Sequence, residues 1–221
     1  MVLATLNPAL VRSIWRTALG FGIGFAFAGL VGGALSLQIH DDNTSRALNT
    51  LLYALAGALG GATLGWGRQS DKCWLAVAGA LSCALGYYIT AAIVSTYVDE
   101  HIQGFLAWDI ALTIQFATIG SLTGLFLGLV QRSRQRLLRM ILAGTIGFAP
   151  YYLASQLLVV IDPVWRLIPG TMGEVWHESL VAAIAACTWG AIGGIFIGVC
   201  FGIANIVRAQ SPTRGMMAPI V

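Results

Sequence analysis

Hydrophobic residues along this chain form long uninterrupted runs, and short polar segments separate one run from the next. Each run holds about 20 apolar residues or more, which is the length of a helix that crosses the hydrocarbon layer of a membrane. The composition agrees, because 57% of the residues are hydrophobic and only 10% are charged. We therefore expect an all-α polytopic membrane protein with six transmembrane helices. The six runs cover residues 17–39, 47–67, 73–98, 110–130, 137–161 and 179–207.

Little of the chain lies outside these runs, and the connecting loops are too short to fold as a separate domain. A signal peptide cleaved before Gly29 is disfavoured, because the first apolar run continues unbroken to Ile39. Any function is therefore expected within the helix bundle or its short loops. The predicted parts are an N-terminus of residues 1–14, a six-helix transmembrane domain of residues 15–208 and a C-terminal tail of residues 209–221.

Basic residues gather on one side of the predicted membrane. They lie before the first run, after the last run and in the second and fourth loops, whereas only Arg46 and Arg166 lie on the other side. By the positive-inside rule, this distribution predicts that both termini are cytoplasmic. We expect a multi-pass protein of a bacterial inner membrane.

A cluster of arginines in the fourth loop has no aromatic residues between its members and no soluble module around it. We interpret it as an anchor at the lipid surface and not as a nucleic-acid site, so the bilayer is the expected partner and nucleic acid is not. The cluster consists of Arg132, Arg134, Arg136 and Arg139.

Glycines recur at intervals of four in the second, fourth and sixth runs, and we call these three sets the glycine ladders. Residues four apart lie on one face of a helix, where glycine lets a second backbone approach closely in lipid. We predict that these glycines are helix-packing positions. They are Gly57, Gly61, Gly65, Gly120, Gly124, Gly128, Gly190, Gly194 and Gly198.

The position of the ladders suggests an internal repeat of three helical hairpins with pseudo-threefold symmetry. Gly24-Phe25 in the first hairpin aligns with Gly147-Phe148 in the third. Low complexity is the alternative, since runs of Gly, Ala, Leu and Ile align easily. Three hairpins resemble the mitochondrial carriers in outline, but their P-x-[DE]-x-x-[KR] signature is absent here, and no family is recognised. The hairpins would be residues 16–68, 73–131 and 139–208.

Charged residues and histidines are absent from the central parts of all six runs. Proton relays, ion-coupled pumps and voltage sensors need an ionisable group at depth. Gly120-Ser121 is faintly similar to a serine protease motif, but no run holds a histidine to activate it. Phosphate loops and zinc protease motifs are also missing. We predict a non-catalytic protein without a cofactor.

Uncharged polar residues at membrane depth offer one candidate site. Two tyrosine pairs follow Gly86 and Pro150, and buried hydroxyls need hydrogen-bond partners. They would form either a pocket for a neutral solute or hydrogen bonds between helices, each worth about 1 kcal/mol. Trp189, inside the sixth run, is interpreted as a packing residue. The candidate solute pocket comprises Tyr87, Tyr88, Gln115, Tyr151, Tyr152 and Gln156.

Histidines and cysteines give a further, less favoured hypothesis. One histidine lies in each predicted outer loop beside an acid, and three converging imidazoles could hold a metal or a pigment. Solvated loop histidines are the preferred interpretation, and the cysteines are interpreted as free apolar thiols. The histidines are His40, His101 and His177, and the cysteines are Cys73, Cys83, Cys187 and Cys200.

Two classes of function remain. The first is an accessory or assembly subunit that packs against other membrane proteins or copies of itself through its glycine faces. The second is a small channel or facilitator for a neutral solute. The two classes differ in where the glycines point. Glycines that face lipid would await a partner, whereas glycines that face helices of the same chain would close the bundle.

Overall fold

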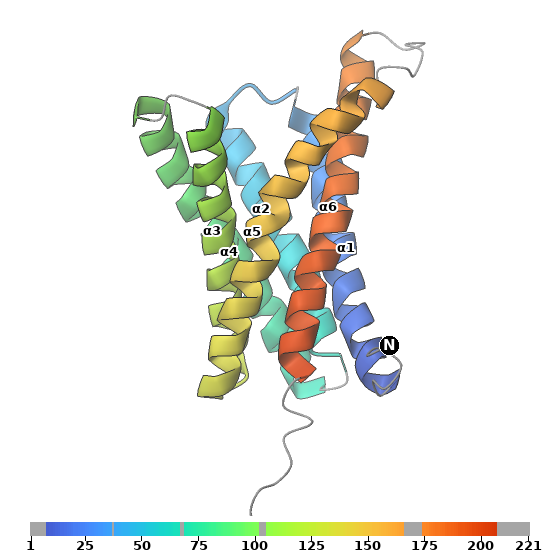
Figure 1. Ribbon diagram of the computed structural model, residues 1–221, viewed down its shortest axis with the longest axis vertical. Helices are drawn as coiled ribbons and strands as arrows, with labels where there is room; N and C mark the ends of the chain where they lie inside the picture. Colours follow the sequence, from blue (N-terminus) through green and yellow to red (C-terminus); the bar gives the residue numbers. More distant parts are fainter. Residues whose placement is uncertain (1–7, 37, 67–68, 102–104, 166–173, 207–221) are drawn as a thin grey trace, which may run out of the picture.

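The computed structural model is an all-α bundle, and six helices are found in the part of the chain that it describes (Figure 1). The described backbone comprises residues 8–36, 38–66, 69–101, 105–165 and 174–206, and the described side chains leave out 36, 69–70, 95–101, 105–109, 151–165 and 174–179. The helices are α1 (Pro8–Ser36), α2 (Asp42–Leu64), α3 (Gln69–His101), α4 (Phe105–Val130), α5 (Arg134–Trp165) and α6 (Glu174–Ile206).

Five of these helices are long and apolar enough to cross a membrane within the described residues, which confirms the prediction of an all-helical chain with many long apolar segments. The expected span at 137–161 is only partly described, so the count of six remains a prediction. Large apolar side chains are exposed along α1 to α6, as lipid contact requires. The five spans are Pro8–Leu35, Asp42–Leu64, Asp71–Val94, Ile110–Val130 and Leu180–Ile206.

Helix boundaries extend beyond several of the apolar runs. α1 begins at Pro8, and proline suits the first turn of a helix because the backbone there has no intrahelical acceptor for an N–H group. α3 continues to His101 and α5 to Trp165, each beyond the end of its apolar run. A polar turn can extend a helix into water once the apolar part has formed it, so the apolar runs underestimate helix length.

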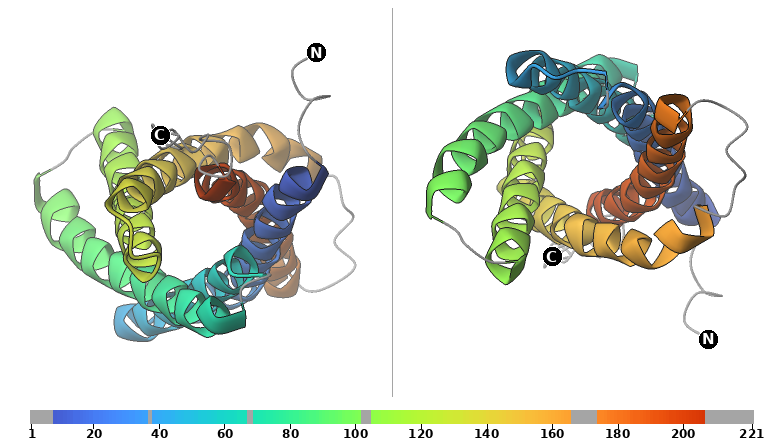
Figure 2. Two further views of the ribbon diagram at one scale, coloured as in Figure 1. Left: turned by 90° about the horizontal axis from the view of Figure 1, so that it is seen from below. Right: turned by 90° about the horizontal axis from the view of Figure 1, so that it is seen from above.

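The helices follow one another around a ring (Figure 2). Each helix contacts the next one along the chain, and α6 contacts α1, which closes the ring. The closest pairs are α2 with α3, α4 with α5, and α6 with α1. The closest partners are therefore not the two helices of a predicted hairpin but helices of neighbouring hairpins. We call the end of the bundle with the α2–α3 and α4–α5 turns the turn end, which lies at the bottom of Figure 1.

Backbone contact explains why these three pairs are the closest. A Cβ atom added at Gly57 of α2 would overlap the carbonyl oxygen of Gly79 of α3, and one at Gly61 would overlap that of Leu75. A glycine Cα–H pointing at a facing carbonyl is a weak hydrogen bond that recurs between closely packed helices. The corresponding pairs are Gly120 with Gly144 and Gly124 with Met140 between α4 and α5, and Gly190 with Phe25 and Gly194 with Phe21 between α6 and α1.

Aromatic side chains fill the middle of the ring. Four phenylalanines from α1, α5 and α6 are at most 2% exposed, and we call them the phenylalanine layer. Their ring centroids lie 5.4 Å apart for Phe21 and Phe201 and 5.7 Å apart for Phe25 and Phe148. Gly60 of α2 makes room for the ring of Phe21. The bundle is thus closed around a solid aromatic core at this level.

Candidate functional site

A cavity of about 280 Å³ that is partly open to the outside lies between α1, α2 and α6, and we call it the interior cavity. Its residues come from the second half of α1 and the first half of α2, so it lies toward the α1–α2 connection and away from the turn end. Phe25 belongs both to its wall and to the phenylalanine layer. The cavity is lined by Phe25, Ala28, Gly29, Gly32, Gly33, Asn49, Leu52, Tyr53, Ala186 and Trp189.

Small residues of α1 create this space. Gly29 and Gly33 hold α1 against α6, because a Cβ atom at either position would overlap the backbone of Ala186 or Ala182. Gly32 is different. A Cβ atom there would meet only Asn49 Oδ1 and a Leu52 methyl group, each at 3.5 Å, which is ordinary contact. Gly32 therefore leaves a space beside α2 that a larger side chain would occupy.

The polar side chains that line the interior cavity are Asn49, Tyr53 and Trp189, and none of them is charged. Trp189 is only 8% exposed, and its indole Nε1 has no hydrogen-bond partner. The Asn49 side chain is hydrogen-bonded to the hydroxyl of Tyr87, whose ring stacks on Tyr53 with centroids 4.6 Å apart. A buried N–H donor without an acceptor is costly, so an acceptor atom of a molecule in the cavity would stabilise it.

The residues of the predicted solute pocket are not all close together. Tyr87 is half-buried next to Tyr53, but Tyr88 is 53% exposed on the outside of the bundle. Consecutive helical residues point about 100° apart, so one tyrosine of the pair faces the ring while the other faces lipid. Tyr151, Tyr152 and Gln156 lie outside the described side chains.

Gln115 lies in a second cavity of about 280 Å³ between α3 and α4. This side chain is 8% exposed and shares the cavity with Thr90 and Thr118 and with apolar residues of both helices. Like the interior cavity, it lies in the half of the bundle away from the turn end, because its residues come from the end of α3 and the start of α4.

Most hydroxyl groups in the bundle have acceptors within their own helix. Thr90 donates to the Gly86 carbonyl at 2.6 Å, and Thr123 donates to the Ile119 carbonyl at 2.8 Å. One hydroxyl pair connects two helices, since Ser121 Oγ and Thr145 Oγ1 are 2.8 Å apart between α4 and α5. These groups stabilise the bundle and have no spare donor for a ligand.

The histidines are placed differently from the prediction of one in each loop. His40 is exposed between α1 and α2, but His101 is the last residue of α3 and His177 lies in the first turn of α6. The loop prediction was wrong for these two because both helices extend beyond their apolar runs. No group of His, Cys, Asp and Glu that could hold a metal occurs among the described residues. The four cysteines are free thiols.

Sequence reasoning missed Asn49 and Tyr53 as site residues and interpreted Trp189 as packing. Asn49 and Tyr53 are four residues apart on α2, so they share a face, which was a signal available in the sequence. No protein-family model matches this chain, and no curated protein or solved structure matches it.

Proposed function

We propose that this protein is a non-catalytic membrane facilitator that binds a small neutral solute inside a ring of six transmembrane helices. The observation that carries the proposal is the interior cavity, whose uncharged lining includes Trp189, a residue with a buried indole N–H that has no partner. The solute would supply a hydrogen-bond acceptor to Trp189 and would lie against the ring of Phe25. Exchange across the membrane then requires the phenylalanine layer to move.

The neutral character of the solute follows from the lining. No charged side chain lines the interior cavity or the cavity that contains Gln115. Among the described residues, the buried polar side chains are threonine, serine and glutamine, and none is charged. An ion would lose its hydration in such a cavity without an opposite charge to compensate, which is costly. Small polyols, urea and amides have a hydrogen-bond acceptor but no net charge, so they suit this lining.

The ring itself would consist of three glycine-laddered pairs related by pseudo-threefold symmetry. The contacts support this repeat because they follow the same register in each pair. In each ladder the first glycine meets a backbone carbonyl of the next helix, and the second glycine meets a carbonyl four residues earlier on that helix. This register aligns Gly79 with Gly144. It also aligns Phe25 with Gly144, whereas the sequence alignment placed Phe25 opposite Phe148.

For the orientation, we propose that the turn end and both termini are cytoplasmic in a bacterial inner membrane. The arginine-rich α4–α5 turn supports this orientation by the positive-inside rule. The interior cavity would then lie in the outer half of the membrane, and the phenylalanine layer would separate it from the cytoplasm.

An accessory subunit, the first of the two classes expected from the sequence, is the second candidate function. Glycine ladders that faced lipid would favour it, because they would be free to pack against a partner. The ladder glycines instead contact helices of the same chain. Other membrane proteins and self-association remain candidate partners through the apolar outer surface, which lipid alone also accounts for.

The test is solute flux in proteoliposomes that contain the purified chain. Osmotic swelling with glycerol and with urea is expected to be faster than in empty liposomes. Trp189→Phe keeps the ring and removes the donor, and we expect it to slow flux by about tenfold, because a hydrogen bond of roughly 1.5 kcal/mol is lost. Trp15→Phe, on the exposed surface of α1, is the matched control and should leave flux unchanged. Equal flux through wild type and Trp189→Phe would contradict the proposal.

A further inference from the structure

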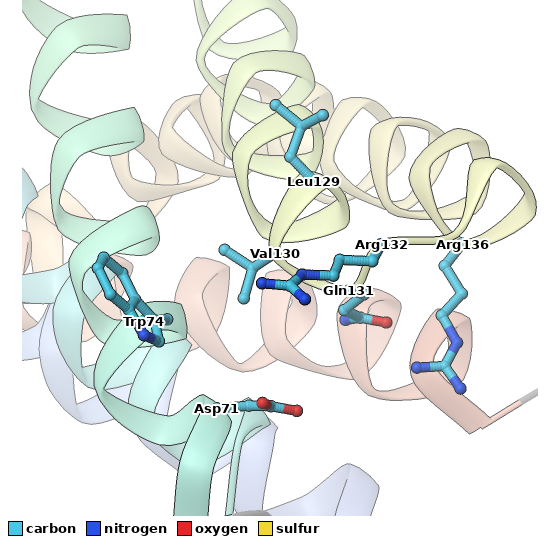
Figure 3. Close-up of a pocket in the computed structure, with 7 residues that line it drawn as sticks. All are labelled: Asp71, Trp74, Leu129, Val130, Gln131, Arg132 and Arg136. Atoms are coloured by element: carbon cyan, nitrogen blue, oxygen red, sulfur yellow. The ribbon is translucent and has the colours of Figure 1, made fainter.

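A separate and larger cavity, of about 710 Å³, lies at the turn end, and we call it the turn pocket (Figure 3). It is formed where the start of α3 faces the end of α4, the α4–α5 turn and the start of α5. It shares no residue with the interior cavity. Its lining residues are Asp71, Trp74, Leu129, Val130, Gln131, Arg132 and Arg136.

The lining of the turn pocket is charged, unlike that of the other two cavities. Arg132 and Arg136 contribute two positive charges and Asp71 contributes one negative charge, so the lining has an excess of positive charge. A third guanidinium belongs to Arg139, which lies three residues after Arg136 on the same face of α5. Its Nη1 atom is buried and has no hydrogen-bond partner. Arg139 does not line the turn pocket, so it adds positive potential beside the site and no ligand within it.

The backbone of Arg132 is strained. Arg132 has a φ of 50°, in the left-handed region that favours glycine. It follows the end of α4, where its N–H donates to the Leu129 carbonyl at 3.0 Å. In Figure 3 its side chain extends from the turn toward Trp74, with Asp71 on the facing part of α3. A glycine would form this turn with less strain, so the position is one where a functional role of the arginine side chain is worth testing.

The position of the turn pocket suits a lipid headgroup. Trp74 is 67% exposed and Leu129 is 56% exposed, so apolar surface adjoins the charged lining. Indole rings favour the depth of lipid headgroups, and Trp66 is also exposed at this end, where Lys72 lies 3.9 Å from its ring centroid. Basic pockets between helices at this depth bind anionic lipid headgroups.

We propose that the turn pocket binds a phosphate group that is carried by an anionic phospholipid. The guanidinium groups of Arg132 and Arg136 bind the phosphate oxygens, and the acyl chains lie along the exposed apolar surface beside Trp74 and Leu129. The N–H groups in the first turn of α5 add positive potential at the same place. Asp71 limits how many negative charges the pocket accepts, which favours a single phosphodiester.

Native mass spectrometry of the full chain in detergent tests the proposal. Phosphatidylglycerol and phosphatidylcholine with identical acyl chains are titrated separately. Phosphatidylglycerol is expected to bind at least about tenfold more tightly, and R132Q and R136Q should each weaken its binding by about tenfold or more, because a charged hydrogen bond is lost. R134Q is the matched control, since Arg134 belongs to the same cluster and is exposed but does not line the pocket. R134Q should bind like the wild type.

A second variant separates binding from folding. R132G should lose phosphatidylglycerol affinity like R132Q, yet it should have a higher Tm because glycine relieves the left-handed strain. Inorganic phosphate is added as a competitor to identify the source of the phosphate group. Competition at millimolar concentration would support a phosphate site that accepts the free ion, and lack of competition would support the lipid. Equal affinity for both lipids, or an equal loss in R134Q and R132Q, would overturn the proposal.

Discussion

At the turn end, the helices of the closest pairs approach until a glycine of one helix lies against a carbonyl oxygen of the other. In the opposite half, a cavity of about 280 Å³ lies between α3 and α4, and the interior cavity lies between α1, α2 and α6. All three closest pairs are therefore held by backbone contacts toward the turn end. In the opposite half α1 and α6 remain in backbone contact, at Gly29 and Gly33, and side chains leave space between the other helices.

This difference between the two halves assigns rigidity to the turn end and solute binding to the opposite half. Backbone contacts fix the distance between helices, because a glycine cannot change rotamer to adapt. Cavities bounded by side chains can adjust to a solute at lower cost. A bundle with backbone contacts in all three pairs at the turn end, and with its two uncharged cavities in the other half, would open and close about the turn end.

The largest expected effect comes from filling a backbone contact. Gly194→Leu places a side chain where α6 meets the backbone of Phe21 and Gly22, so the helices must separate. We expect a loss of well above 3 kcal/mol, beyond the range of about 1 to 3 kcal/mol typical of overpacked cores, and no monodisperse protein in detergent. Size-exclusion chromatography measures this outcome.

The control for this substitution is Gly32→Ala in the other half. Its added methyl group meets only ordinary contacts, and alanine favours a helix over glycine by about 1 kcal/mol. The Tm of Gly32→Ala should equal or exceed that of the wild type. If both variants melt like the wild type, the glycine contacts do not hold the bundle together.

The next largest effect is expected from the phenylalanine layer. Phe148→Ala removes a fully buried ring, which costs about 3 to 5 kcal/mol in protein cores and leaves a cavity in the ring of helices. Glycerol flux should increase because the layer no longer closes the path. Phe196→Ala removes a 45% exposed ring from the lipid-facing side of α6 and should change neither flux nor Tm substantially. Unchanged flux in Phe148→Ala would exclude the layer as the barrier.

A smaller effect is expected from the hydroxyl pair between α4 and α5. The coupling free energy between Ser121→Ala and Thr145→Val, from unfolding of both single variants and the double variant, should be about 0.6 to 2 kcal/mol. Thr118→Val, whose hydroxyl donates only within its own helix, should show no coupling to Thr145→Val. Equal coupling in both pairs would mean that the 2.8 Å contact contributes nothing specific.

The smallest effect is expected at the start of α2. The side chain of Asp41 accepts hydrogen bonds from the Thr44 hydroxyl and backbone N–H, and these bonds lower its pKa below the ordinary value. The folded state thus favours the carboxylate, so this stabilisation is present above about pH 4 and decreases as the pH falls. The Tm difference between wild type and Asp41→Ala should therefore narrow below about pH 4. A difference that is independent of pH would contradict this assignment.

Much of the fold could be predicted from the sequence because lipid imposes a simple pattern. An apolar run long enough to cross the membrane has to be helical, since every backbone polar group must be satisfied there. The pairing of helices was harder to predict. Adjacent spans in the sequence suggested hairpins, whereas the closest contacts join α6 to α1 and also cross the short α2–α3 and α4–α5 turns.

The candidate site was only partly predictable. Tyr87 and Tyr88 were treated as a pair, although adjacent helical residues point in different directions and only Tyr87 faces the ring. Trp189 could be located at membrane depth from the sequence, but an unpartnered donor is apparent only once all neighbouring helices are in place. The turn pocket depends on a left-handed residue at Arg132, which no sequence pattern here indicates.

The contact between α1 and α6 also has a consequence for biosynthesis. These two helices are the first and the last of the six to be made, yet they form one of the three closest pairs. While the chain is inserted into the membrane, the glycine face of α1 has no partner until α6 emerges from the ribosome. Nascent α1 would therefore need lipid or an insertion factor to cover that face. A ring closed in this way completes its fold only after synthesis of the last helix.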